Sequence, residues 1–284
     1  MKKALLATPV AVAATLAFSG CGGTPPGAPQ TVSEDCTPRD EGLTTLKEGV
    51  LTVAQYEYVP FSMSDSPGTL TGLEGDVLTK FAEFECLTLE INKGDSPAMI
   101  TSVATGRADT TLGSWYRTEE RAEKVRLSAP VVTSPFSSVT KEGIDTIDGL
   151  KDLEIGVGQG LIGVDDLKGA LSGLKIYQND DAVFDDIAAG RIDGSVQGYI
   201  AGVQYLKKHD VEGFTVTPLQ PDERVPATRE AGQTNFPVNK DNEALGEALD
   251  GVVEEMRASG ELDEIAEKYD LDPQVMHPGE PNLL

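Results

Sequence analysis

The sequence predicts an α/β protein with two similar lobes, joined by a hinge of two chain crossings and separated by a cleft. From Gly49 onward, short β-branched runs alternate with segments of helical periodicity, which is typical of α/β architecture. One junction also occurs twice, because residues 104–109 read Ala-Thr-Gly-Arg-Ala-Asp and residues 188–193 read Ala-Ala-Gly-Arg-Ile-Asp. The repeat favours two lobes built alike. Chance recurrence is the alternative, since helix–Gly–strand junctions favour these residue types.

The first lobe is expected to alternate strands with helices. Strands are predicted at 50–54, 87–91 and 109–113. A helix is predicted over 76–85, where apolar residues recur at helical spacing. The next helix should begin with Ser96 as its N-cap and Pro97 at its first helical position, and Gly106 should end it.

The second lobe is expected to repeat this order and the chain then to return. A strand is predicted at 153–157, and a helix around Val183 to Ile187 that ends at Gly190. After Pro226, two helices with apolar faces should pack at the end of the chain. With crossings expected near 134–138 and 227–233, the predicted divisions are lobe 1 (first part) at 45–135, lobe 2 at 136–227, the return to lobe 1 with the terminal helices at 228–274, and a tail at 275–284.

The charge balance excludes ordinary nucleic-acid binding. The 284 residues include 23 Lys and Arg against 47 Asp and Glu, a formal net charge of −24, which repels a phosphate backbone. A hydrophobic fraction of 39%, with 8 Phe, 7 Tyr and 1 Trp, is enough for a folded core.

The first 20 residues are predicted to be an export signal. Lys2 and Lys3 precede an apolar run over 4–18, which is too short for a span of about 20 residues. The small residues before Cys21 resemble a bacterial lipoprotein signal, which implies that Cys21 is lipidated. Phe18 departs from the Leu that is usual at its position, so simple secretion is the alternative. The Gly- and Pro-rich stretch that follows should act as a tether, so that 21–44 form a lipidated tether and an N-terminal arm.

Two cysteines remain after Cys21, and we expect Cys36 and Cys86 to form a disulfide. An even pair in an oxidising compartment is more often a disulfide than a metal or catalytic site, and a reactive thiol is the alternative. Neither cysteine has a histidine nearby in sequence, and both His209 and His277 lie in polar stretches. No metal site of recognised spacing is found in the sequence.

The body also carries an ordered set of short motifs. They are Gly-Val-Leu-Thr-Val at 49–53, Tyr-Val-Pro-Phe at 58–61, Gly-Leu-Glu-Gly-Asp at 72–76, Thr-Glu-Glu-Arg at 118–121, Ser-Ala-Pro at 128–130, Gly-Val-Gly-Gln-Gly at 156–160 and Ala-Gly-Arg-Ile-Asp at 189–193. Over 46–271 this set resembles the polar-amino-acid family of extracellular solute-binding proteins, the ligand-capturing components of ABC importers.

The resemblance implies a periplasmic-binding-protein-like fold of type II and a function without chemistry. Two lobes would close over a small polar ligand, such as an amino acid or a derivative with a carboxylate, and the closed form would dock on an ABC permease. It implies no enzyme activity and no cofactor. With the predicted signal, the protein should be a monomer held at the extracellular face of the cell membrane through its lipid anchor alone.

In the first lobe, the resemblance assigns Arg121 to the ligand carboxylate, because a guanidinium offers a planar pair of donors. A surface helix cation is the alternative reading. The resemblance also implies an aromatic wall and donors at a strand end, and core packing is the alternative for the aromatic residues. These positions are Tyr58, Phe61, Gly113, Ser114, Trp115 and Tyr116.

In the second lobe, two positions depart from the family pattern. The implied ligand contacts are Gln159, Gly160, Leu161, Gln197, Gly198 and Tyr199. Leu161 replaces a usual Thr, and Gly198 replaces the Asp that usually takes the α-ammonium of the ligand. An ammonium buried without a counter-charge is costly. Either Glu57 or Glu74 replaces the missing acid, or Gln197 or Tyr199 accepts neutral hydrogen bonds from the ligand. Alternatively, a methylated ammonium or an apolar ring is surrounded by the aromatic residues Tyr56, Tyr58, Trp115, Tyr116 and Tyr199.

Two further functions share this fold. Exported enzymes of the cyclohexadienyl dehydratase type would need a titratable group over the substrate, and the predicted cleft segments contain no histidine. A ligand-sensing lipoprotein would use the same cleft, so the sequence does not separate sensing from transport.

Overall fold

The computed structural model describes residues 32–284 except 34, 41 and 67. The predicted export signal, Cys21 and the tether at 22–29 therefore lie outside the described residues. Within the described part, no helix combines the length and apolar character needed to cross a membrane.

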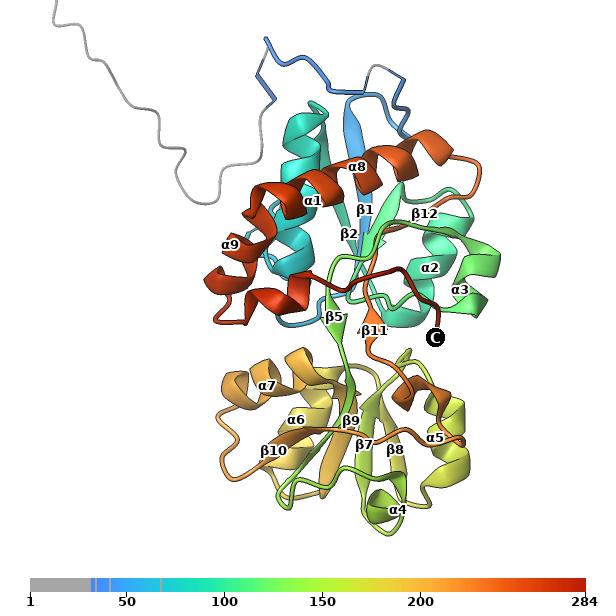
Figure 1. Ribbon diagram of the computed structural model, residues 1–284, viewed down its shortest axis with the longest axis vertical. Helices are drawn as coiled ribbons and strands as arrows, with labels where there is room; N and C mark the ends of the chain where they lie inside the picture. Colours follow the sequence, from blue (N-terminus) through green and yellow to red (C-terminus); the bar gives the residue numbers. More distant parts are fainter. Residues whose placement is uncertain (1–31, 34, 41, 67) are drawn as a thin grey trace, which may run out of the picture.

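The described residues form two lobes, and the first is built on a five-stranded sheet (Figure 1). Its strand order is β2-β1-β3-β12-β4, and β1 pairs in parallel with both β2 and β3. The strands are β1 (Val50–Gln55), β2 (Thr88–Lys93), β3 (Thr110–Leu112), β4 (Arg126–Leu127) and β12 (Pro237–Val238). The helices are α1 (Leu73–Phe84), α2 (Ser96–Ala104), α3 (Glu119–Lys124), α8 (Glu243–Ser259) and α9 (Glu261–Lys268).

The second lobe is built on another five-stranded sheet, of order β10-β6-β9-β7-β8. Its strands are β6 (Phe136–Thr140), β7 (Ile155–Gly158), β8 (Leu174–Tyr177), β9 (Gly194–Gly198) and β10 (Thr215–Pro218). Its helices are α4 (Ile147–Leu150), α5 (Val164–Ala170), α6 (Asp180–Ala188) and α7 (Tyr199–Lys208). Strand β7 pairs in parallel with β8 and β9, so their carboxyl ends meet at one edge of the sheet.

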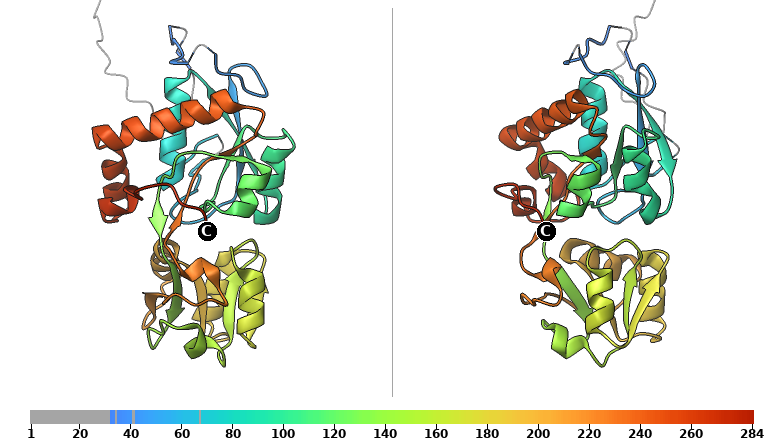
Figure 2. Two further views of the ribbon diagram at one scale, coloured as in Figure 1. Left: turned by 45° about the vertical axis from the view of Figure 1, so that its right-hand side comes forward. Right: turned by 90° about the vertical axis from the view of Figure 1, so that its right-hand side faces the viewer.

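Two short strands connect the lobes. β5 (Thr133–Ser134) pairs antiparallel with β11 (Gly232–Gln233), and Figures 1 and 2 show them between the two lobes. The 3₁₀ helices Pro226–Thr228 and Pro273–Met276 precede and follow the return through this connection. The pairing gives the hinge of two crossings that the sequence predicts.

The repeated junction has the same hydrogen bonds in both lobes. In the first lobe, the Asp109 N–H donates to the carbonyl of Thr52 at 2.8 Å, and the Thr52 N–H donates to the Asp109 carboxylate at 2.8 Å. In the second lobe, Asp193 and Glu154 make the same two bonds at 2.8 and 2.9 Å. The repeat therefore reflects two lobes built alike, with each Asp fixing the entry to a parallel strand.

Some predicted boundaries shift. Helix α1 begins at Leu73 rather than at 76, because the Leu73 and Glu74 N–H groups donate to the carbonyls of Pro60 and Phe61. The N-cap of α2 is Asp95, so the prediction of Ser96 as the cap is wrong by one residue. The predicted disulfide is confirmed: Cys36 and Cys86 are bonded and join the N-terminal arm to the end of α1.

Candidate functional site

A cleft with an empty volume of about 470 Å³, which includes space open to solvent, lies between the lobes. Its lining residues come from both lobes and are mainly aromatic, small or glycine. They are Tyr56, Tyr58, Ser96, Gly113, Ser114, Trp115, Tyr116, Arg121, Gly158, Gln159, Gly160, Leu161, Ile162, Asp180 and Gly198. Within this lining, Arg121 of the first lobe and Asp180 of the second are the charged residues.

Arg121 is held by its own short helix. Thr118 caps α3 by accepting the Arg121 N–H at 3.1 Å, and the guanidinium donates to the Tyr116 carbonyl at 2.6 Å. The guanidinium carbon lies 5.3 Å from the ring centroid of Trp115. Burial lowers the pKa of Arg121 to about 10, and no carboxylate of the described chain lies within 4.0 Å of it. A half-buried cation without a carboxylate of the described chain within ion-pair distance is a candidate anion site.

The loop before Arg121 is fixed by Glu74. This carboxylate is fully buried and accepts the N–H groups of Gly113 at 3.0 Å and Ser114 at 2.9 Å. Desolvation raises its pKa, and the backbone donors oppose that effect. Gly113 and Ser114 both have positive φ, at 146° and 61°. Glu74 therefore holds the strand end in place and is not among the residues that line the cleft.

Glu57 also lies outside the cleft lining, since it is exposed and ion-paired with Lys93 at 3.2 Å. The two acids considered from the sequence as replacements for the missing Asp thus have other partners in the structure.

Asp180 is the acid that the sequence analysis missed. It is 6% exposed, and its carboxylate accepts the hydroxyl of Tyr56 from the other lobe at 3.0 Å. A Cβ at Gly158 would lie 2.8 Å from this carboxylate, so Asp180 needs a glycine there. Desolvation raises the pKa of Asp180 to about 6, although the Tyr56 hydrogen bond lowers it. The available signal was its position just after β8, because the carboxyl ends of parallel strands face a ligand crevice.

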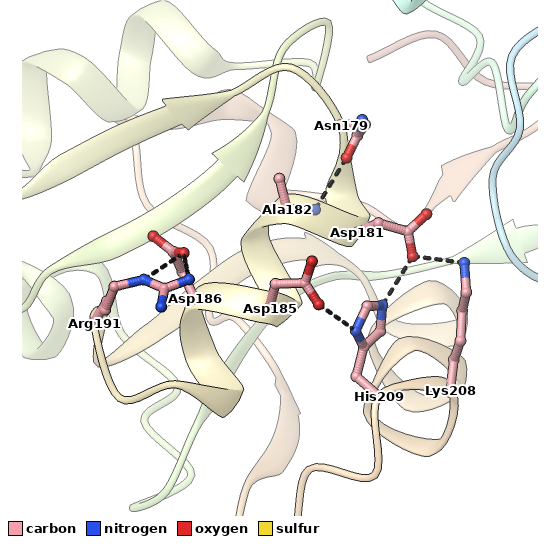
Figure 3. A network of polar contacts seen from close by, with 8 residues as sticks. All are labelled: Asn179, Asp181, Ala182, Asp185, Asp186, Arg191, Lys208 and His209. Carbon is pink, nitrogen blue, oxygen red and sulfur yellow. Dashed lines mark hydrogen bonds and ion pairs between the residues drawn. The ribbon is translucent and has the colours of Figure 1, made fainter.

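Neighbouring charges fix which acid of this segment enters the cleft. Asp181 accepts from Lys208 Nζ at 2.5 Å and lies 2.8 Å from Nε2 of His209, at the end of α7 (Figure 3). His209 Nδ1 lies 3.1 Å from Asp185, and Asn179 caps α6 by accepting the Ala182 N–H. These contacts direct Asp181 and Asp185 toward α7, while Asp180 faces the cleft.

Stacked aromatic rings line the lobe junction behind the charges. Tyr56 and Tyr58 are stacked at 6.0 Å between ring centroids, and Tyr58 lies 5.8 Å from Tyr205 of the other lobe. Trp115 is 3% exposed, and its indole N–H donates to Thr111 at 3.0 Å. The aromatic residues of the lining thus form one wall of the cleft and are also packed in the core. Tyr199 does not belong to this wall.

The lobes touch at further points. Nε2 of Gln178 lies 3.4 Å from the Asp95 carboxylate of the first lobe. A Cβ at Gly160 would lie 2.0 Å from Oγ of Ser96, again across the cleft. These contacts identify a closed arrangement of the two lobes.

Ten of the thirteen predicted ligand residues line the cleft, and three do not. Phe61 is 1% exposed in the core, which was its alternative reading, and Gln197 is buried to the same degree in β9. Tyr199 is 38% exposed at the start of α7 and lies outside the lining. Leu161 lines the cleft beside Ile162, where the chain offers apolar surface in place of a hydroxyl.

No group of three or more His, Cys, Asp or Glu side chains in the described ranges is arranged to hold a metal ion. His277 lies 2.7 Å from Asp263, and neither histidine is a lining residue of the cleft.

The chain is similar to known proteins over most of its length. The model of a family described as bacterial extracellular solute-binding proteins, family 3, matches residues 51–272. The L-cystine-binding protein TcyJ of Escherichia coli (strain K12) is 28% identical over 240 residues, which cover 81% of this chain and 86% of that protein. The histidine-binding periplasmic protein of the same organism is 29% identical over 230 residues, which cover 75% and 84%.

A solved structure shares the fold. An ancestral arginine-binding protein bound to arginine superposes with a TM-score of 0.68 at 24% identity, covering 78% of this chain and 98% of that one.

Proposed function

This chain belongs to family 3 of the bacterial extracellular solute-binding proteins, and from that membership we propose that it captures an amino acid or a close derivative between its lobes. Its two-lobed type II fold is the one that the solved relatives share. The curated relatives bind L-cystine or histidine by name, which supports a small amino acid as the ligand class.

The observation that carries this proposal is the guanidinium of Arg121. It lines the interlobe cleft without a carboxylate partner among the described residues, and Trp115 and the Tyr116 carbonyl fix its direction. A ligand carboxylate would supply the missing counter-charge through two parallel hydrogen bonds. Ser114, which carries a hydroxyl donor, belongs to the same lining, whereas the Gly113 and Ser114 N–H groups are already bonded to Glu74.

Closure of the lobes is the proposed mechanism. Tyr58, Trp115 and Arg121 contact the ligand from one lobe, and the loop around Gly160 contacts it from the other. Because both sets of contacts exist together only when the lobes are closed, the ligand shifts the open–closed equilibrium toward the closed form. An ABC permease would recognise that form.

We further propose that the protein is exported, lipidated at Cys21, monomeric, and held at the extracellular face of the membrane. The sequence features at residues 1–21 support the export and the anchor. Wild-type protein labelled with a radioactive fatty acid should carry the label, and a Cys21→Ser variant should not.

Calorimetric titration of the purified protein with L-histidine, L-arginine and L-cystine tests the proposed binding. Arg121→Ala should weaken every carboxylate ligand by more than about tenfold, because a charge-assisted bidentate contact is lost. Arg107→Ala is the matched control, since Arg107 is an exposed cation of the same lobe bonded to Thr105. Equal affinity of the Arg121 and Arg107 variants would remove the proposed carboxylate site.

The position of Asp180 in the cleft supports one alternative function, that of an exported enzyme with the same fold. A cleft carboxyl group with a pKa raised to about 6 could transfer protons. We propose binding without turnover, so a bound ligand incubated with the protein should give an unchanged NMR spectrum, and new product signals would favour the enzyme.

A further inference from the structure

The cleft contains a second charged position that the family pattern does not supply. Gly198 stands where an Asp is expected, and Asp180 reaches the same cleft from another element, the first turn of α6. Because Arg121 carries the opposite charge on the opposite lobe, the cleft has one positive and one negative wall.

Two other buried acids, Glu74 and Asp109, can be compared with Asp180. Glu74 accepts two backbone N–H groups, from Gly113 and Ser114. Asp109 also accepts two, from Leu46 and Thr52. The backbone donors of both acids thus come from their own lobe, and both acids hold the backbone in place.

Asp180 is bonded differently. Besides its own N–H, its donor in the described chain is the hydroxyl of Tyr56, which belongs to the other lobe. That donor leaves whenever the lobes separate. A buried carboxylate whose neutral partner arrives only on closure is suited to a cation that arrives with the ligand.

The surroundings of Asp180 suit such a cation. Gly158 leaves space for the carboxylate itself to reach the cleft, and Tyr56 and Tyr58 belong to the same cleft lining. Aromatic faces attract cations as well as covering apolar groups. The contacts of Asp181 with Lys208 and His209 remove the neighbouring acid from the cleft.

We propose that Asp180, together with Tyr56, binds the nitrogen cation of the ligand and takes the role that an acid at position 198 would have. The inference rests on the proposed function and narrows its ligand class to zwitterions or carboxylates that also carry a cation. The carboxylate of the ligand faces Arg121 and its nitrogen faces Asp180, so each lobe binds one of the two charges of the ligand.

The test compares ligands with and without the α-ammonium. L-arginine, L-histidine and L-cystine are titrated beside their deamino analogues guanidinopentanoate, imidazolepropionate and dithiodipropionate, which keep the carboxylate. Asp180→Asn keeps the shape and an acceptor for Tyr56 but loses the charge. It should weaken the bound amino acid by at least about tenfold and leave its deamino analogue unchanged.

For arginine, citrulline distinguishes the two possible nitrogens. If Asp180 faces the α-ammonium, the variant loses affinity for citrulline as well. If the variant binds citrulline as the wild type does and loses affinity for guanidinopentanoate, Asp180 faces the side-chain guanidinium, and its role in place of an acid at position 198 is overturned.

The matched control is Asp148→Asn, which removes the same charge from α4 of the same lobe, at a side chain that is 75% exposed and lies outside the cleft lining. It should bind every probe as the wild type does. The inference is overturned if Asp180→Asn keeps wild-type affinity for amino acids, or if it weakens amino acids and all deamino analogues equally. In both cases Arg121→Ala still reports on the proposed function. Failure of the wild type to bind any amino acid would overturn the proposed function and this inference together.

Discussion

The hydroxyl of Tyr116 lies where a side chain at Gly198 would begin. A Cβ at position 198 would lie 2.6 Å from this oxygen and 3.2 Å from Oγ of Ser134, and the hydroxyl itself donates to the Ser134 carbonyl at 3.0 Å. The departure from the family pattern at Gly198 therefore has a steric cause in this chain, because Tyr116 from the first lobe takes the space.

Replacement of Gly198 by Ala should therefore destabilise the protein by about 1–3 kcal/mol, the usual cost of overpacking a filled core. The cost should fall in a Tyr116→Phe background, where the hydroxyl is absent and the nearest ring carbon, Cζ, lies 3.8 Å from a Cβ at position 198. Denaturant unfolding of the wild type, the two single variants and the double variant gives the coupling energy between positions 116 and 198. Equal costs in both backgrounds would show that the hydroxyl is not the obstacle.

The pKa of Asp180 predicts a pH-dependent stability of the ligand-free protein. Its value of about 6 in the folded protein lies above the ordinary value of 3.8, so the folded state binds more protons between these pH values. The free energy of unfolding should then fall as the pH rises from about 4 to about 6, by up to about 3 kcal/mol from this group. Asp180→Asn cannot ionise and should be more stable than the wild type at pH 7, with the difference vanishing toward pH 4.

Unfolding of wild type and variant at each pH provides the measurement. The groups around Asp180 are Asp181, with a lowered pKa, and Tyr56, Tyr58 and Tyr205, whose raised pKa values keep them neutral throughout. His209 beside Asp181 is present in both proteins, so its contribution cancels in the difference. If the free energies of unfolding of wild type and Asp180→Asn changed with pH in parallel, the raised pKa of Asp180 would be contradicted.

The two Asp residues of the repeated junction should contribute unequally to the free energy of unfolding. Asp109 is 3% exposed and accepts two backbone N–H groups, from Leu46 and Thr52, whereas Asp193 is exposed and accepts one, from Glu154. Asp109→Ala should cost about 2–4 kcal/mol because it leaves buried donors unpaired, and Asp193→Ala should cost about 1 kcal/mol or less. Chemical denaturation of both variants measures the two costs, and equal values would mean that burial does not set them.

The sequence predicted the elements that depend on local pattern. Apolar periodicity, the Gly stops and the repeat located most strands and helices, and the pair Cys36 and Cys86 was correct. The start of α1 was missed because it depends on the carbonyls of Pro60 and Phe61, which precede the helix by a loop.

The candidate site was predictable where it follows short motifs, as for Arg121 and Gly160. Asp180 was not, because residues 180, 181, 185 and 186 are all Asp and the rotation of α6 decides which one enters the cleft. Contacts with Lys208 and His209, more than twenty positions later in the chain, set that rotation. The close approach of Tyr116 to position 198 likewise joins residues that are far apart in the sequence.

Gly160 offers a test of closure itself. Its φ is +84°, and a Cβ there would lie 2.0 Å from Oγ of Ser96, so Gly160→Ala should keep the lobes from reaching this closed arrangement. Gly190→Ala is the matched control, because that residue also has positive φ, +66°, in the same lobe, yet a Cβ there meets nothing within 4 Å. Both variants should lose about 1 kcal/mol of stability from backbone strain. Only Gly160→Ala should weaken the binding of an amino acid ligand, by about tenfold or more, since contacts from both lobes form together in the closed state.

Calorimetric titration gives the affinities, and small-angle scattering with saturating ligand should show a larger radius of gyration for Gly160→Ala than for Gly190→Ala. Equal affinities and equal radii would mean that ligand capture does not require the contact between Gly160 and Ser96.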